Sequence, residues 1–295
     1  MAEVLRLPPG RLDDELRGLD HLDLPIHPGA DKLRSLWSAT WPKLAAIAIV
    51  LGVWQLAVWA QIWHDWALPG PVPVLQRLGQ DLTRPDLPTY LPPAIVTTLE
   101  RAALGFGLAL IIGTMIGLAI VRSRLLRTAV ASLIAGLQTM PSIAWFPLAM
   151  LLFGITDTAI MFVVVLGAAP SIANGLIAGV DHIPRILLRA GQVMGARGVN
   201  RYRHVILPAS LPSFIGGIKQ GWAFAWRSLM AGELLVIIAS KPSIGVKLQF
   251  GREFSDSRGL LSTMIVILVI GLVVDLAFFG NLDRVIRRRW GLLES

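Results

Sequence analysis

Long apolar runs separated by short polar segments fill most of this chain. A helix rises about 1.5 Å per residue, so about 20 apolar residues cross the hydrocarbon core of a bilayer. Runs of that length predict an all-α membrane protein in which residues 44–290 form a six-helix bundle, preceded by a leader (1–43) and followed by a short tail (291–295). The predicted spans are Leu44–Trp63, Val96–Val121, Thr128–Phe153, Thr158–Val180, Leu211–Ala239 and Leu260–Leu282.

The leader differs from the rest of the chain because it is rich in proline and carboxylates. Leucines at helical spacing within 11–22 indicate a short amphipathic helix, which a cytoplasmic partner could dock on. A solvated, irregular leader is the alternative.

Prolines interrupt two of the apolar runs. Pro141 and Pro147 lie in the third run, and Pro170 lies in the fourth. Proline removes a backbone donor and kinks a helix, and broken helices are tolerated at membrane depth only where protein or a water-filled cavity covers them. We therefore expect breaks at these positions. Pro141, Ser142 and Trp145 are candidates for the lining of a solute pathway, and a structural kink is the alternative.

Small residues recur at every fourth position of the second span. They are Gly105, Ala109, Gly113 and Gly117. Small residues let helix backbones approach closely in lipid, where packing replaces the hydrophobic effect. This stripe predicts a compact bundle and indicates no particular function.

Composition and charge agree with a membrane protein. Hydrophobic residues make up 54% and charged residues 16% of the chain, whereas a soluble domain carries about a quarter charged residues. Of the 27 Lys and Arg residues, 18 fall in segments on one side of the six spans and six on the other. This asymmetry places both termini in the cytoplasm and explains the net charge of +8 without a nucleic-acid partner.

Three ionisable residues are expected deep in the membrane, where charges are costly and usually paired or functional. Lys219 and Asp275 lie at similar depths of antiparallel spans, so we expect a structural ion pair. Arg227, flanked by Trp222 and Trp226, either presents its guanidinium to an anionic solute or pairs with Glu233 or another carboxylate. These four residues, Trp222, Trp226, Arg227 and Glu233, complete a set of seven candidates for the solute pathway with Pro141, Ser142 and Trp145.

The cytoplasmic segment 181–208 carries the strongest pattern. Apolar residues recur at helical spacing after Pro184, and Gly195 and Gly198 allow a break before a second, basic helix. A structured, half-apolar helix pair is typical of a docking surface for another protein, whereas a loose loop would explain neither the periodicity nor the glycines.

This segment resembles the EAA loop of ABC-importer permeases, whose pattern is Glu-Ala-Ala, three residues, Gly, nine residues, Ile, any residue, Leu-Pro. The spacing matches throughout, and the departures are Arg189 for Glu, Gly191 for Ala and Val205 for Ile. The corresponding residues here are Arg189, Ala190, Gly191, Gly195, Val205, Leu207 and Pro208.

Three further stretches, 98–106, 141–155 and 225–233, resemble the nitrate/sulfonate/taurine/bicarbonate branch of these permeases. The resemblance covers about residues 44–290. It implies a type I importer fold and a multi-pass protein of the bacterial inner membrane. It also implies a solute pathway formed with a second permease copy, two ATP-binding cassette subunits that hold ATP and Mg²⁺ and receive the EAA loop, and a periplasmic or lipid-anchored binding protein that delivers the solute. The solutes of the branch are small anions such as sulfonate, taurine, nitrate or bicarbonate, and pyrimidine or flavin-like precursors.

Other classes fit less well. No phosphate-binding loop of the Gly-x4-Gly-Lys-Ser/Thr type occurs, so the chain is not expected to hydrolyse ATP or to hold a cofactor. The five histidines lie outside the spans without metal-ligand spacing, so neither a metal site nor an enzyme is expected. An ion-coupled secondary transporter remains the alternative, although such folds commonly show internal repeats, and none is visible here.

Overall fold

The computed structural model describes residues 30–289, and its regular elements are all helical. The predicted leader helix at 11–22 and the tail lie outside the described residues. The chain divides into two compact units, Met1–Trp63 and His64–Ser295. In the first unit, helix α2 (Ala30–Trp59) contains the apolar stretch Thr40–Trp59, which is long enough to cross a membrane.

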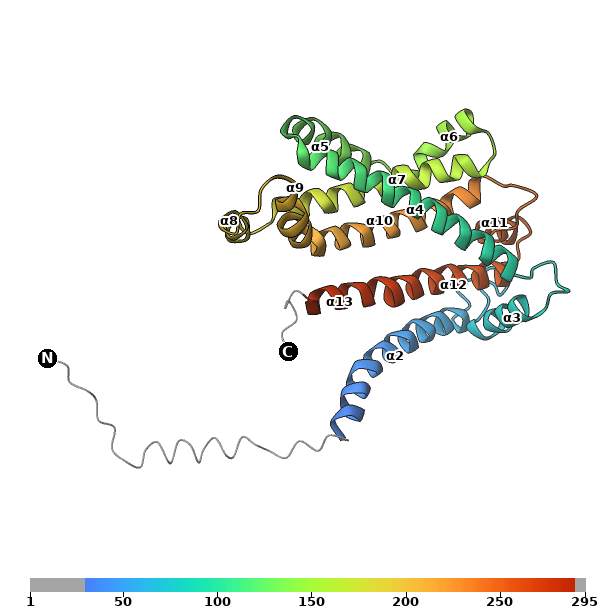
Figure 1. The fold of residues 1–295 in the computed structure, drawn as a ribbon. Coiled ribbons are helices and arrows are strands. Elements are labelled where there is room, and N and C mark those ends of the chain that lie inside the picture. Colours follow the sequence, from blue (N-terminus) through green and yellow to red (C-terminus); the bar gives the residue numbers. More distant parts are fainter. Residues whose placement is uncertain (1–29, 290–295) are drawn as a thin grey trace, which may run out of the picture. The chain divides into compact units, whose positions relative to one another are not determined.

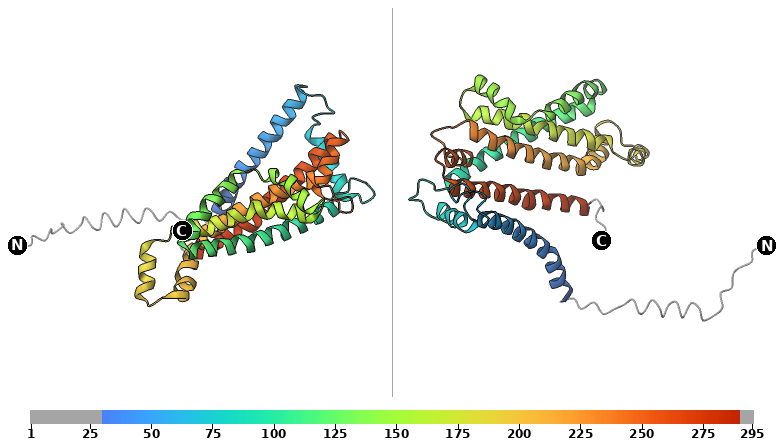
Figure 2. Two further views of the ribbon diagram at one scale, coloured as in Figure 1. Left: turned by 90° about the horizontal axis from the view of Figure 1, so that it is seen from above. Right: turned by 180° about the vertical axis from the view of Figure 1, so that it is seen from behind.

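The second unit is a bundle of long helices with short helices at both ends (Figures 1 and 2). Among the short elements, η1 is a 3-10 helix, whereas η2 and η3 are π-helical. In chain order the elements are α3 (Pro71–Thr83), α4 (Pro92–Arg122), α5 (Arg124–Thr139), η1 (Ser142–Trp145), α6 (Phe146–Phe153), α7 (Asp157–Asp181), α8 (Arg185–Val193), α9 (Gly198–Arg201), η2 (Tyr202–Ile206), α10 (Leu207–Leu235), α11 (Ile244–Glu253), α12 (Ser257–Val273), η3 (Val274–Phe279) and α13 (Gly280–Arg289).

The expected all-helical architecture is confirmed, and helices coincide with all six predicted spans. By length and apolarity, four helical stretches within residues 30–289 can cross a membrane, and the bent pair Ser132–Thr139 and Ser142–Phe153 counts as a fifth. The remaining predicted span coincides with α10, which is 29 residues long but contains Lys219 and Arg227. The structure thus gives four or five candidate spans within residues 30–289, and a sixth stays a prediction.

Of the three prolines expected to break a helix, only Pro141 lies at a break of the chain. Near Pro141 the chain bends by 95° between α5 and the η1–α6 segment, as predicted. Pro147 lies in the first turn of α6, where its missing N–H is not needed. The predicted interruption at Pro170 is wrong, because α7 continues through this buried residue. Neighbouring helices enclose α7, and such packing compensates for a lost backbone hydrogen bond in membrane helices.

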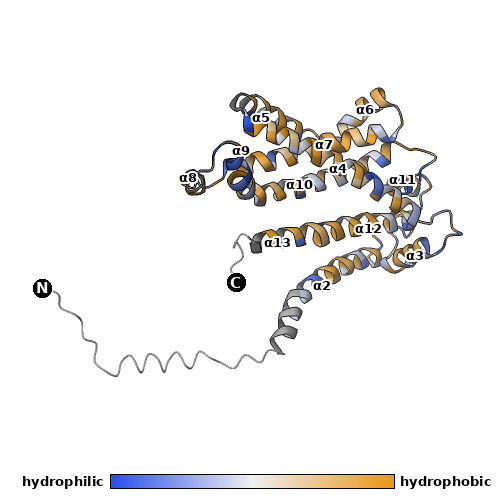
Figure 3. Cartoon of the chain, viewed as in Figure 1, coloured by the Kyte–Doolittle hydropathy of each residue, from blue (hydrophilic) through white to orange (hydrophobic). Residues whose placement is uncertain are grey.

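The small-residue stripe of α4 forms a close helix contact, as predicted, and the partner helix is α7. All four stripe residues are buried, and a Cβ added to Gly113 would lie 2.6 Å from the Ala169 carbonyl oxygen. The main hydrophobic core lies where α4, α7 and α10 meet. Apolar residues dominate these helices and α12, whereas hydrophilic residues gather at the ends of the bundle, near α9 and α11 (Figure 3).

α7 and α10 cross in close contact at a pair of glycines. A Cβ added to Gly217 would lie 2.5 Å from the Cα of Gly175, and one added to Gly175 would lie 2.4 Å from the Cα of Gly217. The two backbones therefore touch, and neither position has room for a methyl group.

We predict that Gly217→Ala destabilises the bundle by about 1–3 kcal/mol, because the added methyl forces α7 and α10 apart. Gly216→Ala is the matched control, since a Cβ at Gly216 meets nothing within 4 Å and alanine favours a helix. Thermal denaturation of the purified protein in detergent measures both. Equal midpoints for the two variants would contradict the close crossing.

Candidate coupling segment and solute cavity

The chain between α7 and α10 projects from one end of the bundle as two short helices (Figures 1 and 2). α8 ends in a Schellman motif: the N–H of Ala196 donates to the Gly191 carbonyl at 2.9 Å, and the N–H of Gly195 donates to the Gln192 carbonyl at 3.0 Å. This motif needs a left-handed residue, and Gly195 has φ +81°. The glycine break expected from the sequence is therefore present.

One close contact folds the returning chain against α8. Gly191 is buried, and a Cβ added there would lie 2.7 Å from Cγ2 of Val205 in η2. These two residues are also two of the three departures from the EAA pattern. The smaller residue at 191 thus makes the space that the side chain of Val205 occupies.

Large apolar side chains on this projecting segment contact solvent instead of the bundle. Isolated apolar residues on a surface are ordinary, but a contiguous group marks an interaction site. Their exposed fractions are 74% for Ile186, 45% for Leu187, 90% for Val193, 78% for Met194 and 78% for Val199.

The sequence-predicted coupling residues surround this apolar group. Gly191 is buried in the fold of the segment, and Val205 and Pro208 are half-buried. The exposed members are Arg189, Ala190, Gly195 and Leu207.

Four of the seven residues predicted to line a solute pathway line one cavity of about 320 Å³. It lies beside the bend between α5 and η1 and is closed on other sides by α7 and α10. The four residues are Pro141, Ser142, Trp145 and Arg227. The sequence did not point to Gln138, whose Nε2 donates to Ser171 at 3.2 Å beside the same cavity.

Arg227 supplies the positive charge of this cavity. Its Nε donates to the Ala223 carbonyl of its own helix at 2.9 Å, and its guanidinium carbon lies 5.0 Å from the ring centroid of Phe224. The side chain is exposed, and among the described residues no carboxylate pairs with it. The guanidinium is therefore held at the cavity with capacity for an anion.

The two tryptophans near Arg227 in the sequence belong to the core instead. Trp222 packs edge-on against Phe106 at 5.4 Å between ring centroids and stacks on Trp226 at 5.9 Å. Neither lines the cavity with Arg227. Residues one and five positions before Arg227 face a different side of α10, because a helix turns about 100° per residue.

Glu233 is also absent from the cavity, because it lies in a fully buried polar cluster. Its Oε2 accepts hydrogen bonds from Thr98 Oγ1 at 2.9 Å and from the N–H of Gly245 at 3.0 Å, and its Oε1 lies 3.0 Å from Arg101 Nη1. The carboxylate therefore joins α4, α10 and α11, and its partner is Arg101 rather than Arg227.

The same cluster extends to the start of α7. Arg101 Nη2 lies 2.7 Å from Asp157 Oδ1, and Asp157 also accepts a hydrogen bond from Lys241. The sequence placed Arg101 and Glu233 in apolar runs, which signals that each needs a partner. The pairing joins residues 132 positions apart, so the sequence pattern could not identify it.

Lys219 and Asp275 lie together as expected for an ion pair. Lys219 Nζ is 3.2 Å from Asp275 Oδ2, and both side chains are partly exposed. This contact joins α10 to η3.

A helical bundle, a projecting pair of short helices with a glycine turn, and a cavity lined by α5, η1, α7 and α10 define the class of this protein. The chain matches the family described as "Binding-protein-dependent transport system inner membrane component" over residues 105–288, more than half of its length. It belongs to this family and is a membrane permease subunit of an ABC importer.

Individual relatives place it in the nitrate/sulfonate/taurine branch. It is 28% identical to the taurine transport system permease protein TauC of Escherichia coli, over 79% of this chain and 84% of TauC. It is 25% identical to the nitrate import permease protein NrtB of Synechocystis, over 80% and 86% of the two chains. Its fold is similar to a chain of the inward-facing MetNI methionine ABC transporter, with a TM-score of 0.56 at 19% identity, covering 65% of this chain and 94% of that one.

We predict that Glu233→Ala destabilises the protein by about 3–5 kcal/mol, because it leaves the buried Arg101 without one of its carboxylates. The control is Asp181→Ala, which removes the partner of Arg127 in a partly exposed pair of 2.7 Å and should cost less than about 1 kcal/mol. Thermal denaturation in detergent compares the two. Similar losses in both variants would contradict a structural role of the Glu233 cluster.

Proposed function

We propose that two copies of this chain form the solute pathway of an ATP-driven importer, and that α8, α9 and η2 together dock into a separate ATPase subunit. The observation that carries this proposal is the exposed apolar group on a segment that is nevertheless rigidly folded. Its Schellman turn and the contact between Gly191 and Val205 fix the helix pair. The apolar side chains are left for a partner, and burying them gives the driving force for docking.

The proposed topology has six spans with both termini in the cytoplasm of a bacterial cell. The Lys and Arg asymmetry supports this orientation. α10 extends about 43 Å at 1.5 Å per residue, which exceeds the roughly 30 Å hydrocarbon core. The contact between Lys219 and Asp275 offsets one of its charges. α10 therefore serves as the fifth of the six spans in chain order, despite its lower apolarity.

Transport then follows from the continuity of the chain at the coupling segment. η2 runs directly into α10, so a displacement of the docked segment moves the helix that carries Arg227. ATP binding draws the two ATPase subunits together, and their docked segments move with them. The cavity then opens outward to a solute delivered by a binding protein. Hydrolysis of ATP on the partner subunits, which hold ATP and Mg²⁺, restores the inward-facing state.

The proposed solute is a small anion. An unpaired, exposed guanidinium beside the hydroxyl-bearing residues Thr139 and Ser142 suits a sulfonate, nitrate or carboxylate group. The taurine and nitrate permeases among the relatives support the same class. A pyrimidine or flavin-like precursor, or an ion-coupled mechanism without an ATPase, is the alternative.

Docking is tested with Val193→Asp, which places a charge on the most exposed apolar residue of the segment. We expect the ATPase subunit to stop co-purifying, while thermal stability stays unchanged because 90% of this side chain is exposed. Val72→Asp makes the same change on a 60% exposed residue at the opposite end of the bundle and should retain the ATPase. Retention by both variants, or ion-driven transport by the chain alone, would refute the coupling proposal.

The solute class is tested with Arg227→Gln and Arg227→Lys in reconstituted importer. Loss of a charge-assisted hydrogen bond costs about 1.5–3 kcal/mol, so Gln should raise the half-saturating solute concentration about tenfold or more, and Lys should raise it less. Uptake of taurine, of nitrate and of an uncharged pyrimidine provides the measurement. An unchanged half-saturation in the Gln variant would remove Arg227 from the solute site.

A further inference from the structure

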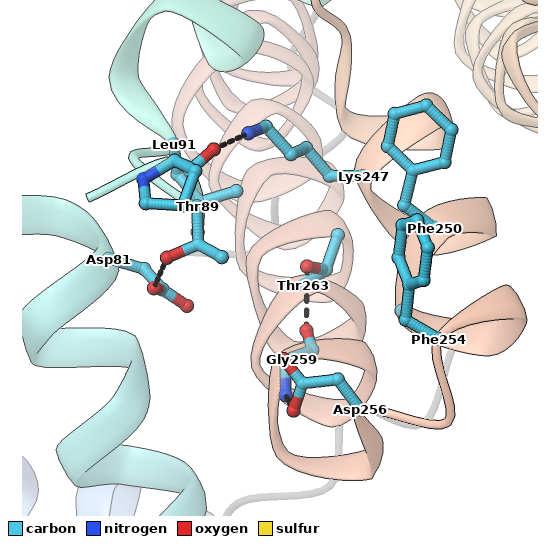
Figure 4. A pocket seen from close by; sticks show the side chains of 11 residues that line it. Asp81, Thr89, Leu91, Lys247, Phe250, Phe254, Asp256, Gly259 and Thr263 are labelled. Carbon is cyan, nitrogen blue, oxygen red and sulfur yellow. Dashed lines mark hydrogen bonds between the residues drawn. The ribbon is translucent and has the colours of Figure 1, made fainter.

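A second cavity lies at the end of the bundle opposite to α8 and α9 (Figure 1). It measures about 370 Å³ and is formed by α3, the loop that follows α3, α11 and the start of α12. Figure 4 shows its labelled side chains, which include both charged and aromatic groups. In the proposed topology this end faces the outside of the cell, where a binding protein must meet the permease.

The carboxylates of this cavity are already satisfied. Asp81 is 2% exposed, lies 3.1 Å from Arg77 Nε, and accepts hydrogen bonds from the hydroxyls of Thr89 and Ser262. Asp256 lies 3.0 Å from Arg77 Nη2 and caps α12 through the N–H of Gly259. Both charges are therefore used to join α3 to α12, and neither is free for a cationic ligand.

Lys247 on α11, unlike these two carboxylates, hydrogen-bonds an uncharged group. Its Nζ donates a hydrogen bond to the Pro88 carbonyl, which carries no charge. Loss of hydration on burial lowers the pKa of Lys247, and the charge of Asp81 offsets this only in part. An ammonium group that has lost water, that hydrogen-bonds a neutral carbonyl and that a nearby carboxylate stabilises only in part is a ready partner for an incoming carboxylate.

An aromatic rim stands next to this ammonium group. Phe250 lies on α11 and Phe254 follows directly after its last residue; their ring centroids are 5.9 Å apart, and they are 40% and 77% exposed. Figure 4 shows both rings along the side of the cavity formed by α11. Exposed aromatic side chains, Phe included, are enriched where proteins bind other proteins.

The side of the cavity formed by α11 and its flanking residues is basic. Residues 240–259 contain four Lys or Arg residues and two carboxylates. One of these carboxylates is Asp256, and the other, Glu253, accepts a hydrogen bond from Gln249. Arg252 and Arg258 are exposed. This charge balance attracts an acidic protein surface and opposes a basic one.

α11 is also firmly attached to the helix that carries the coupling segment. The N–H of Gly245 donates to Glu233 near the end of α10, and a Cβ added to Gly245 would lie 2.3 Å from the Cβ of Glu233. A displacement of α11 by a bound partner would therefore also displace the end of α10.

We propose that this cavity receives an acidic, apolar-tipped segment of the importer's solute-binding protein. A carboxylate of that segment pairs with Lys247, and an apolar side chain covers Phe250 and Phe254. The inference rests on the proposed function, and the family description itself names a binding-protein-dependent system. A lipid headgroup and a second permease copy are the competing occupants, and the test separates them.

The test uses the full complex with its ATPase in nanodiscs and the binding protein that stimulates its ATP turnover. Lys247→Glu should raise the concentration of binding protein needed for half-maximal stimulation at least about tenfold, because it sets like charges against each other. Phe254→Ala should raise that concentration about fivefold. Arg84→Glu is the matched control: it reverses an exposed charge outside the cavity, and the shift should stay below about twofold.

A crosslinking experiment identifies the occupant. The chain contains no cysteine, so Phe254→Cys carries a single photoreactive label in an otherwise unmodified permease. Capture of the purified binding protein, competed by excess unlabelled binding protein, is the expected result. Capture only of lipid or of a second permease copy would overturn the docking proposal.

The two proposals fail in different ways. If binding protein stimulates the Lys247→Glu and Phe254→Ala complexes as well as the unmodified one, the docking site is wrong and the importer assignment stands. If no ATPase associates with the unmodified chain, the proposed function itself is wrong. Basal ATP turnover of each variant verifies that the complex has folded, and Lys247→Gln provides a milder change should the charge reversal prevent assembly.

Discussion

Contact between the backbones of α7 and α10 is the constraint on which the rest of this permease depends. In lipid, burial from water does not draw helices together, so close van der Waals packing must do so. Gly175 and Gly217 provide it by leaving no side chain between the two helices. α10 is thereby held in the centre of the bundle, with the proposed coupling segment at its start, Arg227 along its length and Glu233 near its end. The two proposed functional regions and the structural Glu233 cluster thus share one supported helix.

Polar interactions complement this packing at the ends of the helices. The Glu233 cluster joins α4, α7, α10 and α11, and the Asp81 cluster joins α3 to α12. A buried charge without partners is costly, but a carboxylate that accepts several hydrogen bonds fixes the geometry around it. These clusters therefore define how α3 and α11 attach to the bundle, whereas the exposed groups of α8 and α11 are the surfaces on which the proposed partners dock.

Local patterns predicted much of this structure. Hydropathy located the helices, the small-residue stripe located the contact of α4, and the glycine spacing located the turn after α8. Three features depended on long-range packing and could not be predicted. α7 continues through Pro170 because its neighbours enclose it, Trp222 and Trp226 face the core rather than the cavity, and Glu233 meets Arg101 from a distant part of the chain.

The fit of Gly191 against Val205 has a consequence for engineering. The two positions share one volume, so the size of each residue restricts the other. A graft of this helix pair onto a different permease must therefore transfer both residues together. Exchanging either one by itself would place two side chains in one space or leave a void, and the helices would then meet at a different angle.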